Sequence, residues 1–247
     1  MSRPGAGPHR FFSHPFDRRL HMESMISYPR PDGQTVNAYL AEPESGSGPG
    51  VVVIQEWWGL NDQIRGVADR LAAAGYVALV PDLYRGKSTV EAEEAHHLMS
   101  SLKFGEAATQ DVRGAVQFLK ARCPKVGVTG FCMGGVLTLM ALANVPEVDA
   151  GVAWYGFPSP EHLDAGNIRV PLMGHWATQD AAFAIATVDV LEEKFRAAKL
   201  DYTGHRYLAH HAFANETAVG RGRIPITQYD AAWAQMAWDR TLRFFGR

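Results

Sequence analysis

The sequence predicts a single α/β domain built on a mostly parallel central sheet with helices on both faces. Apolar and β-branched runs alternate along the chain with segments whose apolar residues recur at helical spacing. One run, Val51 to Ile54, is apolar throughout and preceded by glycine, which is typical of a strand buried on both faces. Strands that alternate with helices of about ten or more residues indicate a parallel sheet. The 247 residues suffice for one such domain, and no internal repeat or low-complexity linker divides them.

The start of the domain predicts a β-hairpin at one edge of the sheet. Alternating residues at 26–28 and 35–41 flank Pro31-Asp32-Gly33, and Asp-Gly between two alternating runs is a hairpin signal. A loop rich in Gly and Ser over 43–49 then leads to the buried strand at 51–54.

The rest of the chain alternates helix and strand. Ile64, Val67 and Leu71 form the apolar stripe of a helix over 61–74, which ends at Gly75. The further expected elements are a strand at 76–80, helices at 91–100 and 106–121, a strand at 126–129, a helix at 136–143, strands at 149–154 and 170–174, a helix at 182–198, a strand at 201–207 and an amphipathic helix from Gln228. In such an open sheet, functional residues gather at the carboxyl ends of the strands.

Composition and charge exclude several classes of function. The formal net charge of −2 offers no electrostatic basis for a nucleic-acid partner. No apolar run reaches the roughly 18 residues that a membrane span needs. The two cysteines, Cys123 and Cys132, could pair, but they lack metal-site spacing, and we expect reduced thiols in a cytoplasmic protein with no bound metal.

The N-terminal stretch differs from the rest of the chain. Residues 1–21 carry several Arg and His residues amid Pro and Gly and have no apolar segment, so they do not form a secretory signal. Met22 or Met25 would suit the pattern that follows as an alternative start. We expect residues 1–21 to be a disordered or added extension and 22–247 to be the domain, with a short transit-like or tethering segment as the alternative.

A glycine-rich turn follows the strand at 126–129. Its sequence, Gly130-Phe131-Cys132-Met133-Gly134-Gly135, has the G-x-S-x-G spacing of a nucleophile elbow, with cysteine in place of serine. The sharp turn demands small neighbours, and the N-terminus of the following helix lowers the pKa of a thiol. The alternative is an ordinary turn in which Cys132 is a small buried residue.

An acid and a histidine follow later strands in the order that α/β-hydrolases use. Asp180 comes after the strand at 170–174, and His211 comes after the last strand. Each has a plainer interpretation, because Asp180 could cap the next helix and His211 is one of ten histidines, with His210 beside it. Their common position after strands nevertheless predicts a triad in which Cys132 is the nucleophile.

The loop after the buried strand 51–54 supplies two further candidates. In this fold the oxyanion is held by the N–H after the nucleophile, here Met133, and by one from an earlier loop, here Trp57. Glu56 precedes two tryptophans, so partial desolvation should raise its pKa. It is either a proton partner for the thiol or an acceptor for nearby backbone groups.

Five motifs together resemble one known family. They are Gln55-Glu56 with an aromatic pair and Gly59, Pro81-Asp82-Leu83-Tyr84, the cysteine elbow, Gln179-Asp180, and His211-x-Phe213. From about Ser24 to the C-terminus, the chain resembles the dienelactone hydrolases (carboxymethylenebutenolidases). The resemblance implies an α/β-hydrolase fold without a large cap, no cofactor, a triad of Cys132, His211 and Asp180, and a part for Glu56 in activating the thiol.

Three positions depart from that family's pattern. The family holds the substrate carboxylate with two arginines, and the matching positions here are Asn215 and Gly86, with Arg85 one place before the latter. A serine that often follows the histidine is Ala212. Because a bidentate carboxylate partner is lost, anionic lactones should bind less well.

The expected substrate-binding side chains come from several loops. They are Trp58, Tyr84, Arg85, Trp154, Tyr155, Phe213 and Asn215. The aromatic members could line a pocket, although some of them could equally belong to the core.

The sequence therefore predicts a hydrolase that cleaves lactones or activated carboxylic esters through a thioester on Cys132. Its partner would be a small-molecule substrate, and the protein would be a monomer or a homodimer. One alternative is a promiscuous hydrolase of neutral aryl esters or phosphoesters. Two further alternatives belong to other classes of protein. One is a non-catalytic ligand-binding protein of the same fold. The other is a thiol redox protein, and the absence of a C-x-x-C motif disfavours this second alternative.

Overall fold

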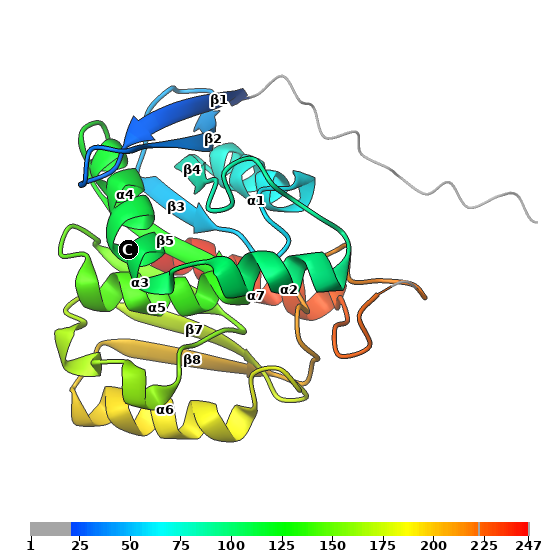
Figure 1. The fold of residues 1–247 in the computed structure, drawn as a ribbon. Coiled ribbons are helices and arrows are strands. Elements are labelled where there is room, and N and C mark those ends of the chain that lie inside the picture. Colours follow the sequence, from blue (N-terminus) through cyan, green and yellow to red (C-terminus); the bar gives the residue numbers. More distant parts are fainter. Residues whose placement is uncertain (1–20, 222, 247) are drawn as a thin grey trace, which may run out of the picture.

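The computed structural model describes residues 21–221 and 223–246 and confirms a mostly parallel sheet of eight strands (Figure 1). The strands are β1 His21–Pro29, β2 Thr35–Pro43, β3 Gly50–Ile54, β4 Val77–Pro81, β5 Val126–Phe131, β6 Ala150–Trp154, β7 Leu172–Ala177 and β8 Tyr202–Tyr207. Their order is β1-β2-β4-β3-β5-β6-β7-β8. β1 and β2 form the expected antiparallel hairpin, β2 also runs antiparallel to β4, and the strands from β4 to β8 are parallel to their neighbours.

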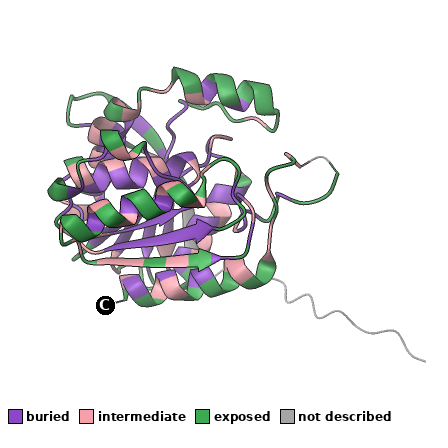
Figure 2. Cartoon of the chain, turned by 90° about the horizontal axis from the view of Figure 1, so that it is seen from below, coloured by how far each residue is buried: buried purple, intermediate pink, exposed green. Residues whose placement is uncertain are grey.

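Helices cover both faces of the sheet. They are α1 Asp62–Ala73, α2 Ala92–Ser101, α3 Phe104–Glu106, the π-helical segment η1 Ala107–Val112, α4 Arg113–Lys120, α5 Met133–Asn144, the 3₁₀ turns η2 Pro160–His162 and η3 Ala165–Asn167, α6 Ile185–Ala197 and α7 Ala231–Phe245. One buried cluster joins α4, α5 and α6 to the sheet, and a second joins α1 and α7 to its other face. Figure 2 shows the central strands buried between helices that expose their outer sides, whereas β8 is buried only in part.

Several expected boundaries are shifted in the structure. The helix predicted over 106–121 is present as a helical run without a break up to Lys120, but it divides by type, because Ala107–Val112 is the π-helical η1 between α3 and α4. Within η1, the carbonyl oxygen of Asp111 accepts a hydrogen bond from the Tyr28 hydroxyl at 2.8 Å, a partner that local periodicity does not reveal. The strand expected at 170–174 occupies Leu172–Ala177. β1 begins at His21, while residues 1–20, most of the expected extension, lie outside the described residues.

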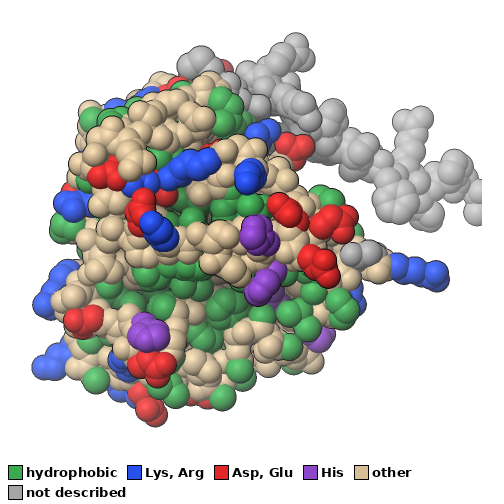
Figure 3. All heavy atoms as spheres, viewed as in Figure 1, with side chains coloured by type: hydrophobic (Ala, Val, Ile, Leu, Met, Phe, Trp, Pro, Cys, Tyr) green, Lys and Arg blue, Asp and Glu red, His purple; other side chains and the backbone are tan. Residues whose placement is uncertain are grey.

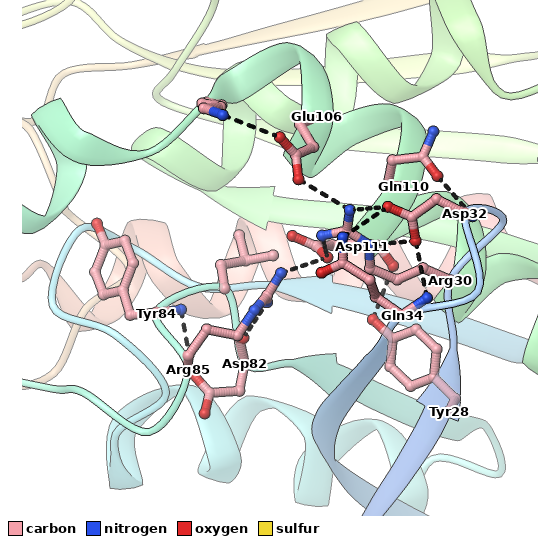
Figure 4. Close-up of polar contacts among 12 residues, drawn as sticks. Tyr28, Arg30, Asp32, Gln34, Asp82, Tyr84, Arg85, Glu106, Gln110 and Asp111 are labelled. Carbon is pink, nitrogen blue, oxygen red and sulfur yellow. Dashed lines mark hydrogen bonds and ion pairs between the residues drawn. The ribbon is translucent and has the colours of Figure 1, made fainter.

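A buried ion cluster ties the hairpin to the helical layer (Figure 4). The Arg30 guanidinium, with 2% of its side chain exposed, donates to Asp32, Glu106 and Asp111. Arg85 donates to the same carboxylate of Asp111 at 2.8 Å. Burial raises the pKa of Asp111, and the two guanidinium groups act in the opposite direction. The cluster therefore joins β1, η1 and the turn after β4 around one shared carboxylate.

The surface carries charges of both signs. On the face shown in Figure 3, Lys and Arg side chains are interspersed with Asp and Glu. Within residues 21–221 and 223–246, no helix has the length and apolar character needed to cross a membrane.

A buried histidine links β7, β8 and α7. His175 is 0% exposed, and its ring nitrogens contact Tyr207 Oη at 2.8 Å and Thr241 Oγ1 at 2.9 Å. Burial lowers its pKa well below the usual value, so the ring is neutral and has one donor and one acceptor nitrogen. Tyr207 Oη also accepts from Arg240. In either tautomer, Thr241 Oγ1 is the hydrogen-bond partner of His175 Nε2.

We expect Thr241→Val to leave His175 Nε2 without a hydrogen-bond partner in the core. The free energy of unfolding, measured by urea denaturation, should fall by about 1–3 kcal/mol. Thr109→Val is the matched control, because the Thr109 hydroxyl bonds the Gly105 carbonyl at the surface. Its removal should change the stability by less than about 0.5 kcal/mol. Equal effects of the two substitutions would contradict the assigned hydrogen bond.

Candidate active site

Cys132 lies on a strained turn between β5 and α5. Its φ of 54° and ψ of −116° place it in a region that costs a non-glycine residue about 1–3 kcal/mol. The two glycines of the predicted elbow permit the turn by close backbone packing. A Cβ on Gly130 would lie 2.2 Å from the Gly134 carbonyl oxygen, and one on Gly134 would lie 2.4 Å from the Ile54 oxygen. The backbone therefore has the geometry that the spacing predicted.

The structure brings His211 and Asp180 to this turn. His211 Nδ1 lies 2.8 Å from Asp180 Oδ2, both residues are buried, and the imidazole is near enough to Cys132 for the charge of that residue to raise its pKa. The other oxygen of Asp180 accepts from the backbone N–H groups of Ala182 and Phe183, each at 2.8 Å. Asp180 does not cap α6, whose N-cap is Ala184; one of its oxygens holds the turn before that helix while the other faces the imidazole, as a triad requires.

The electrostatics of His211 favour a charged ring. Burial lowers its pKa, but the charge on Cys132, the hydrogen bond to Asp180 and the charge on Asp180 outweigh it and raise the pKa to about 10. A histidine that remains protonated near neutral pH favours the thiolate form of a neighbouring cysteine.

Two aromatic rings hold the imidazole in place. Phe183 stacks on His211 with ring centroids 5.5 Å apart and an angle of 22°, and Tyr155 meets it edge-on at 5.3 Å and 75°. The sequence interpretation did not identify Phe183. No local signal marks it, because the ring reaches His211 only through the turn that Asp180 holds.

Glu56 lies in a closed polar environment beside His211. It is 3% exposed, its Oε1 accepts from the Tyr155 hydroxyl at 3.1 Å, and its Oε2 accepts from Asn215 Nδ2 at 2.6 Å. Burial raises the pKa of Glu56, while the charge on His211 and the two hydrogen bonds lower it, and burial dominates. The desolvation expected from the sequence is confirmed, and the two donors that bond Glu56 are side chains instead of the suggested backbone groups.

Two side chains predicted to contact substrate, Asn215 and Arg85, form hydrogen bonds with other groups of the protein instead. Asn215 is 2% exposed, and its Oδ1 accepts from the N–H and the hydroxyl of Thr217, which directs its Nδ2 at Glu56. Arg85 donates to the Asp82 carbonyl and to Asp111, and Figure 4 shows it pointing toward Asp111. The expectation that these side chains face substrate needs correction, since packing against distant elements orients both.

The predicted aromatic lining also changes. Trp154 and Phe213 are 1% and 0% exposed and belong to the core instead of a pocket wall. The Trp154 indole donates to Thr129 Oγ1 at 3.1 Å, as a buried indole N–H requires a partner. Tyr155 is equally buried, although it touches both Glu56 and His211. Tyr84 is 6% exposed, and its hydroxyl contacts Met133 Sδ.

A cleft of about 550 Å³ lies beside this cluster. Trp58, Ala212 and Asn215 line its inner side, so it adjoins the loops of Glu56 and His211. Arg223 also lines it, but one of its guanidinium nitrogens donates to the carbonyls of Ile224, Pro225 and Thr227. The acidic side chains Asp62 and Glu91 lie on the same wall. Among the described lining residues, the cleft therefore presents no cation other than this backbone-bound arginine.

The two predicted oxyanion donors lie next to the cysteine loop and the glutamate. Met133 is the first residue of α5, where backbone N–H groups have no partner within the helix. Trp57 follows Glu56 and packs against Trp58, with ring centroids 5.0 Å apart. Both assignments stay predictions. In the described part of the chain, no group of three or more His, Cys, Asp or Glu residues is placed to hold a metal ion.

We expect the His211 imidazolium to make alkylation of Cys132 nearly independent of pH. Because the pKa of His211 is raised, the imidazolium is present below about pH 10 and is lost as the pH rises through that value. Alkylation by iodoacetamide should therefore be nearly constant between about pH 7 and pH 9. In His211→Ala, the rate at pH 7 should fall about thirtyfold and rise with pH up to about 8.5, the pKa of a free thiol. The same flat profile in both proteins would contradict the pairing.

The family of the chain follows from comparison with known proteins. A model of the Dienelactone hydrolase family matches residues 36–247. The chain is 36% identical to Protein usf of Aquifex pyrophilus over 236 residues, covering 91% of this chain and 98% of that protein. It is 30% identical to a carboxymethylenebutenolidase homolog of Xenopus tropicalis over 174 residues, covering 68% and 70%. The crystal structure of the dienelactone hydrolase-like promiscuous phosphotriesterase P91 from metagenomic libraries superposes with a TM-score of 0.81 at 25% identity, covering 92% and 98%. On its sequence and its fold, the chain belongs to the dienelactone hydrolase family and is a hydrolase of that type.

Proposed function

We propose that this protein hydrolyses uncharged lactones or activated carboxylic esters through a thioester on Cys132. The observation that carries the proposal is the position of His211, which lies 2.8 Å from Asp180 and near enough to the strained Cys132 turn for the charge of Cys132 to raise its pKa. A thiolate on a helix N-terminus beside an imidazolium is the arrangement of an activated cysteine nucleophile.

The reaction would proceed in two displacements. The Cys132 thiolate attacks the carbonyl carbon, and the electron pair of the C=O bond moves to oxygen, where the N–H groups of Met133 and Trp57 stabilise it. The tetrahedral adduct collapses as His211 gives its proton to the leaving oxygen, which leaves a thioester. His211 then takes a proton from water, the hydroxide attacks the thioester, and the acid and the thiolate are released.

The two carboxylates would serve different purposes in this cycle. Asp180 holds the imidazole by Nδ1 and stabilises its positive charge. Glu56 lies on the other side of the site, and its charge couples to His211 across a desolvated environment. We assign it the role of assisting thiol activation, because a buried carboxylate favours the protonated form of a nearby histidine.

The charge balance of the site supports an uncharged substrate. The buried carboxylate of Glu56 would disfavour a second carboxylate beside it, whereas Asp62 is exposed, paired with Arg65 and adds little. Asn215 stands where the family has an arginine, and Arg85 is committed to Asp111. An anionic lactone would therefore enter without a charge-assisted partner.

A second candidate activity is the hydrolysis of neutral phosphotriesters. It is supported by the similarity to P91, whose title describes it as a promiscuous phosphotriesterase. A phosphotriester is uncharged, as the cleft favours, and its attack by a thiolate also develops negative charge on an oxygen.

We expect an acyl adduct on Cys132 when the protein is mixed with p-nitrophenyl acetate. Intact-protein and peptide mass spectrometry should find one acetyl group on this residue within the first turnover. The adduct should be absent from Cys132→Ala. Cys123→Ala is the matched control, since Cys123 is buried outside the site, and it should acylate like the unmodified protein. A protein that binds the ester without acylation would indicate the non-catalytic alternative.

We expect uncharged substrates to react faster than anionic ones of the same shape. One lost charge-assisted hydrogen bond, worth about 1.5–3 kcal/mol, corresponds to about tenfold or more in kcat/KM. The comparison uses an unsaturated lactone bearing a carboxylate and its methyl ester, assayed at the lactone bond. A higher kcat/KM for the carboxylate form would overturn the assignment to uncharged substrates.

A further inference from the structure

The Tyr84 hydroxyl has an unusual hydrogen-bond partner. It donates to Met133 Sδ at 3.2 Å in a region where Tyr84 is 6% and Met133 1% exposed. A phenol is a strong donor and a thioether a weak acceptor, so this O–H is poorly satisfied for a buried group. A phenylalanine would fill the same space without the desolvation that the hydroxyl incurs.

The turn that carries Tyr84 is held on several sides. Asp82 accepts the Tyr84 N–H at 3.2 Å with one carboxylate oxygen and the Gly86 N–H with the other. Arg85 and Gly86 both have positive φ, at 56° and 91°, and the Arg85 guanidinium is bonded to Asp111. Figure 4 shows Tyr84 pointing away from the Arg85–Asp111 pair. The ion cluster therefore fixes the backbone of the turn while the phenol projects toward α5.

The phenol contacts the residue that directly follows the nucleophile. That residue is Met133, whose N–H is the predicted oxyanion donor. Burial raises the pKa of Tyr84, and the charge on Cys132 raises it further. The phenol therefore keeps its proton over the working pH range and acts only as a donor.

We propose that Tyr84 is a third oxyanion donor, whose hydroxyl leaves the Met133 sulfur and bonds the substrate oxygen as negative charge develops on it. The exchange replaces a weak acceptor by an anionic one, so the new hydrogen bond forms chiefly in the transition state, where it accelerates the reaction. No covalent bond to the tyrosine forms or breaks, and its proton stays on Oη. The inference rests on the proposed function, because it requires a tetrahedral adduct on Cys132.

The test uses an aryl trifluoromethyl ketone, in which thiolate addition forms an S–C bond and moves the carbonyl electron pair to oxygen. Its affinity reports oxyanion stabilisation without turnover. For Tyr84→Phe we expect its dissociation constant to rise about 10- to 100-fold and kcat for p-nitrophenyl acetate acylation to fall by a similar factor, in keeping with the loss of one oxyanion donor. The rate of iodoacetamide alkylation should be unchanged, because that reaction forms no oxyanion, and the melting temperature should be equal or higher.

Tyr202→Phe is the matched control. Tyr202 is the first residue of β8, and its hydroxyl also lies in a partly buried hydrogen-bond network away from the site. It accepts from the Trp176 indole and donates to Glu192. This variant should bind the ketone like the unmodified protein.

The outcomes separate the two proposals. If the unmodified protein forms no adduct with the ketone, the proposed function fails. If it does, and Tyr84→Phe binds the ketone equally well, the oxyanion role of Tyr84 is wrong even where kcat changes. A drop in iodoacetamide reactivity equal to the loss of ketone affinity would also overturn the role, because it would show a general disturbance of Cys132.

Discussion

The close approach of three backbone segments around Cys132 is the constraint on which the rest of the site depends. The Cys132 N–H donates to the Trp154 carbonyl of β6 at 3.0 Å, while Gly134 packs against the end of β3. A Cβ on Gly156 would lie 1.9 Å from the Cys132 carbonyl oxygen, so the loop after β6 also closes on the turn. With the turn held in this way, the sulfur stands at the N-terminus of α5, where the helix dipole favours a thiolate.

The parallel sheet brings the other groups to this sulfur. Glu56 follows β3, Asp180 follows β7 and His211 follows β8, so all three reach the carboxyl edge of the sheet from different strands. Their environments differ in kind. Asp180 is bonded by two backbone N–H groups and the imidazole, whereas Glu56 is bonded by an amide and a phenol. Burial raises the pKa of Glu56, and its two neutral hydrogen-bond donors offset this only in part. The carboxylate therefore stays sensitive to the charge on His211.

The departures from the family pattern have structural consequences beyond the lost cations. Asn215 completes the hydrogen bonding of Glu56, and Thr217 fixes the orientation of its amide. Arg85 joins the Asp111 cluster, which connects the turn after β4 to the hairpin. The amide of Asn215 therefore supports Glu56 where an arginine would have presented positive charge, and the charge of Arg85 is paired with Asp111.

The sequence by itself determined the fold class, the cysteine elbow, and the candidates Asp180 and His211. These features depend on local patterns, because strand and helix periodicity, Gly-x-Cys-x-Gly spacing and chain order are legible within short windows. It also indicated the desolvation of Glu56, since a carboxyl group directly after a buried strand has little access to water.

The tertiary structure decided which way the side chains face. Trp154 and Phe213 lie in the core, Phe183 stacks on His211, and Asn215 bonds a residue 159 positions away in the chain. The division of the helix over 106–121 has the same origin, because Tyr28 and Arg30 contact Asp111 from β1 and from the start of the turn that follows it. Such orientations result from packing between segments that are distant in the sequence, and neither periodicity nor motif spacing contains that information.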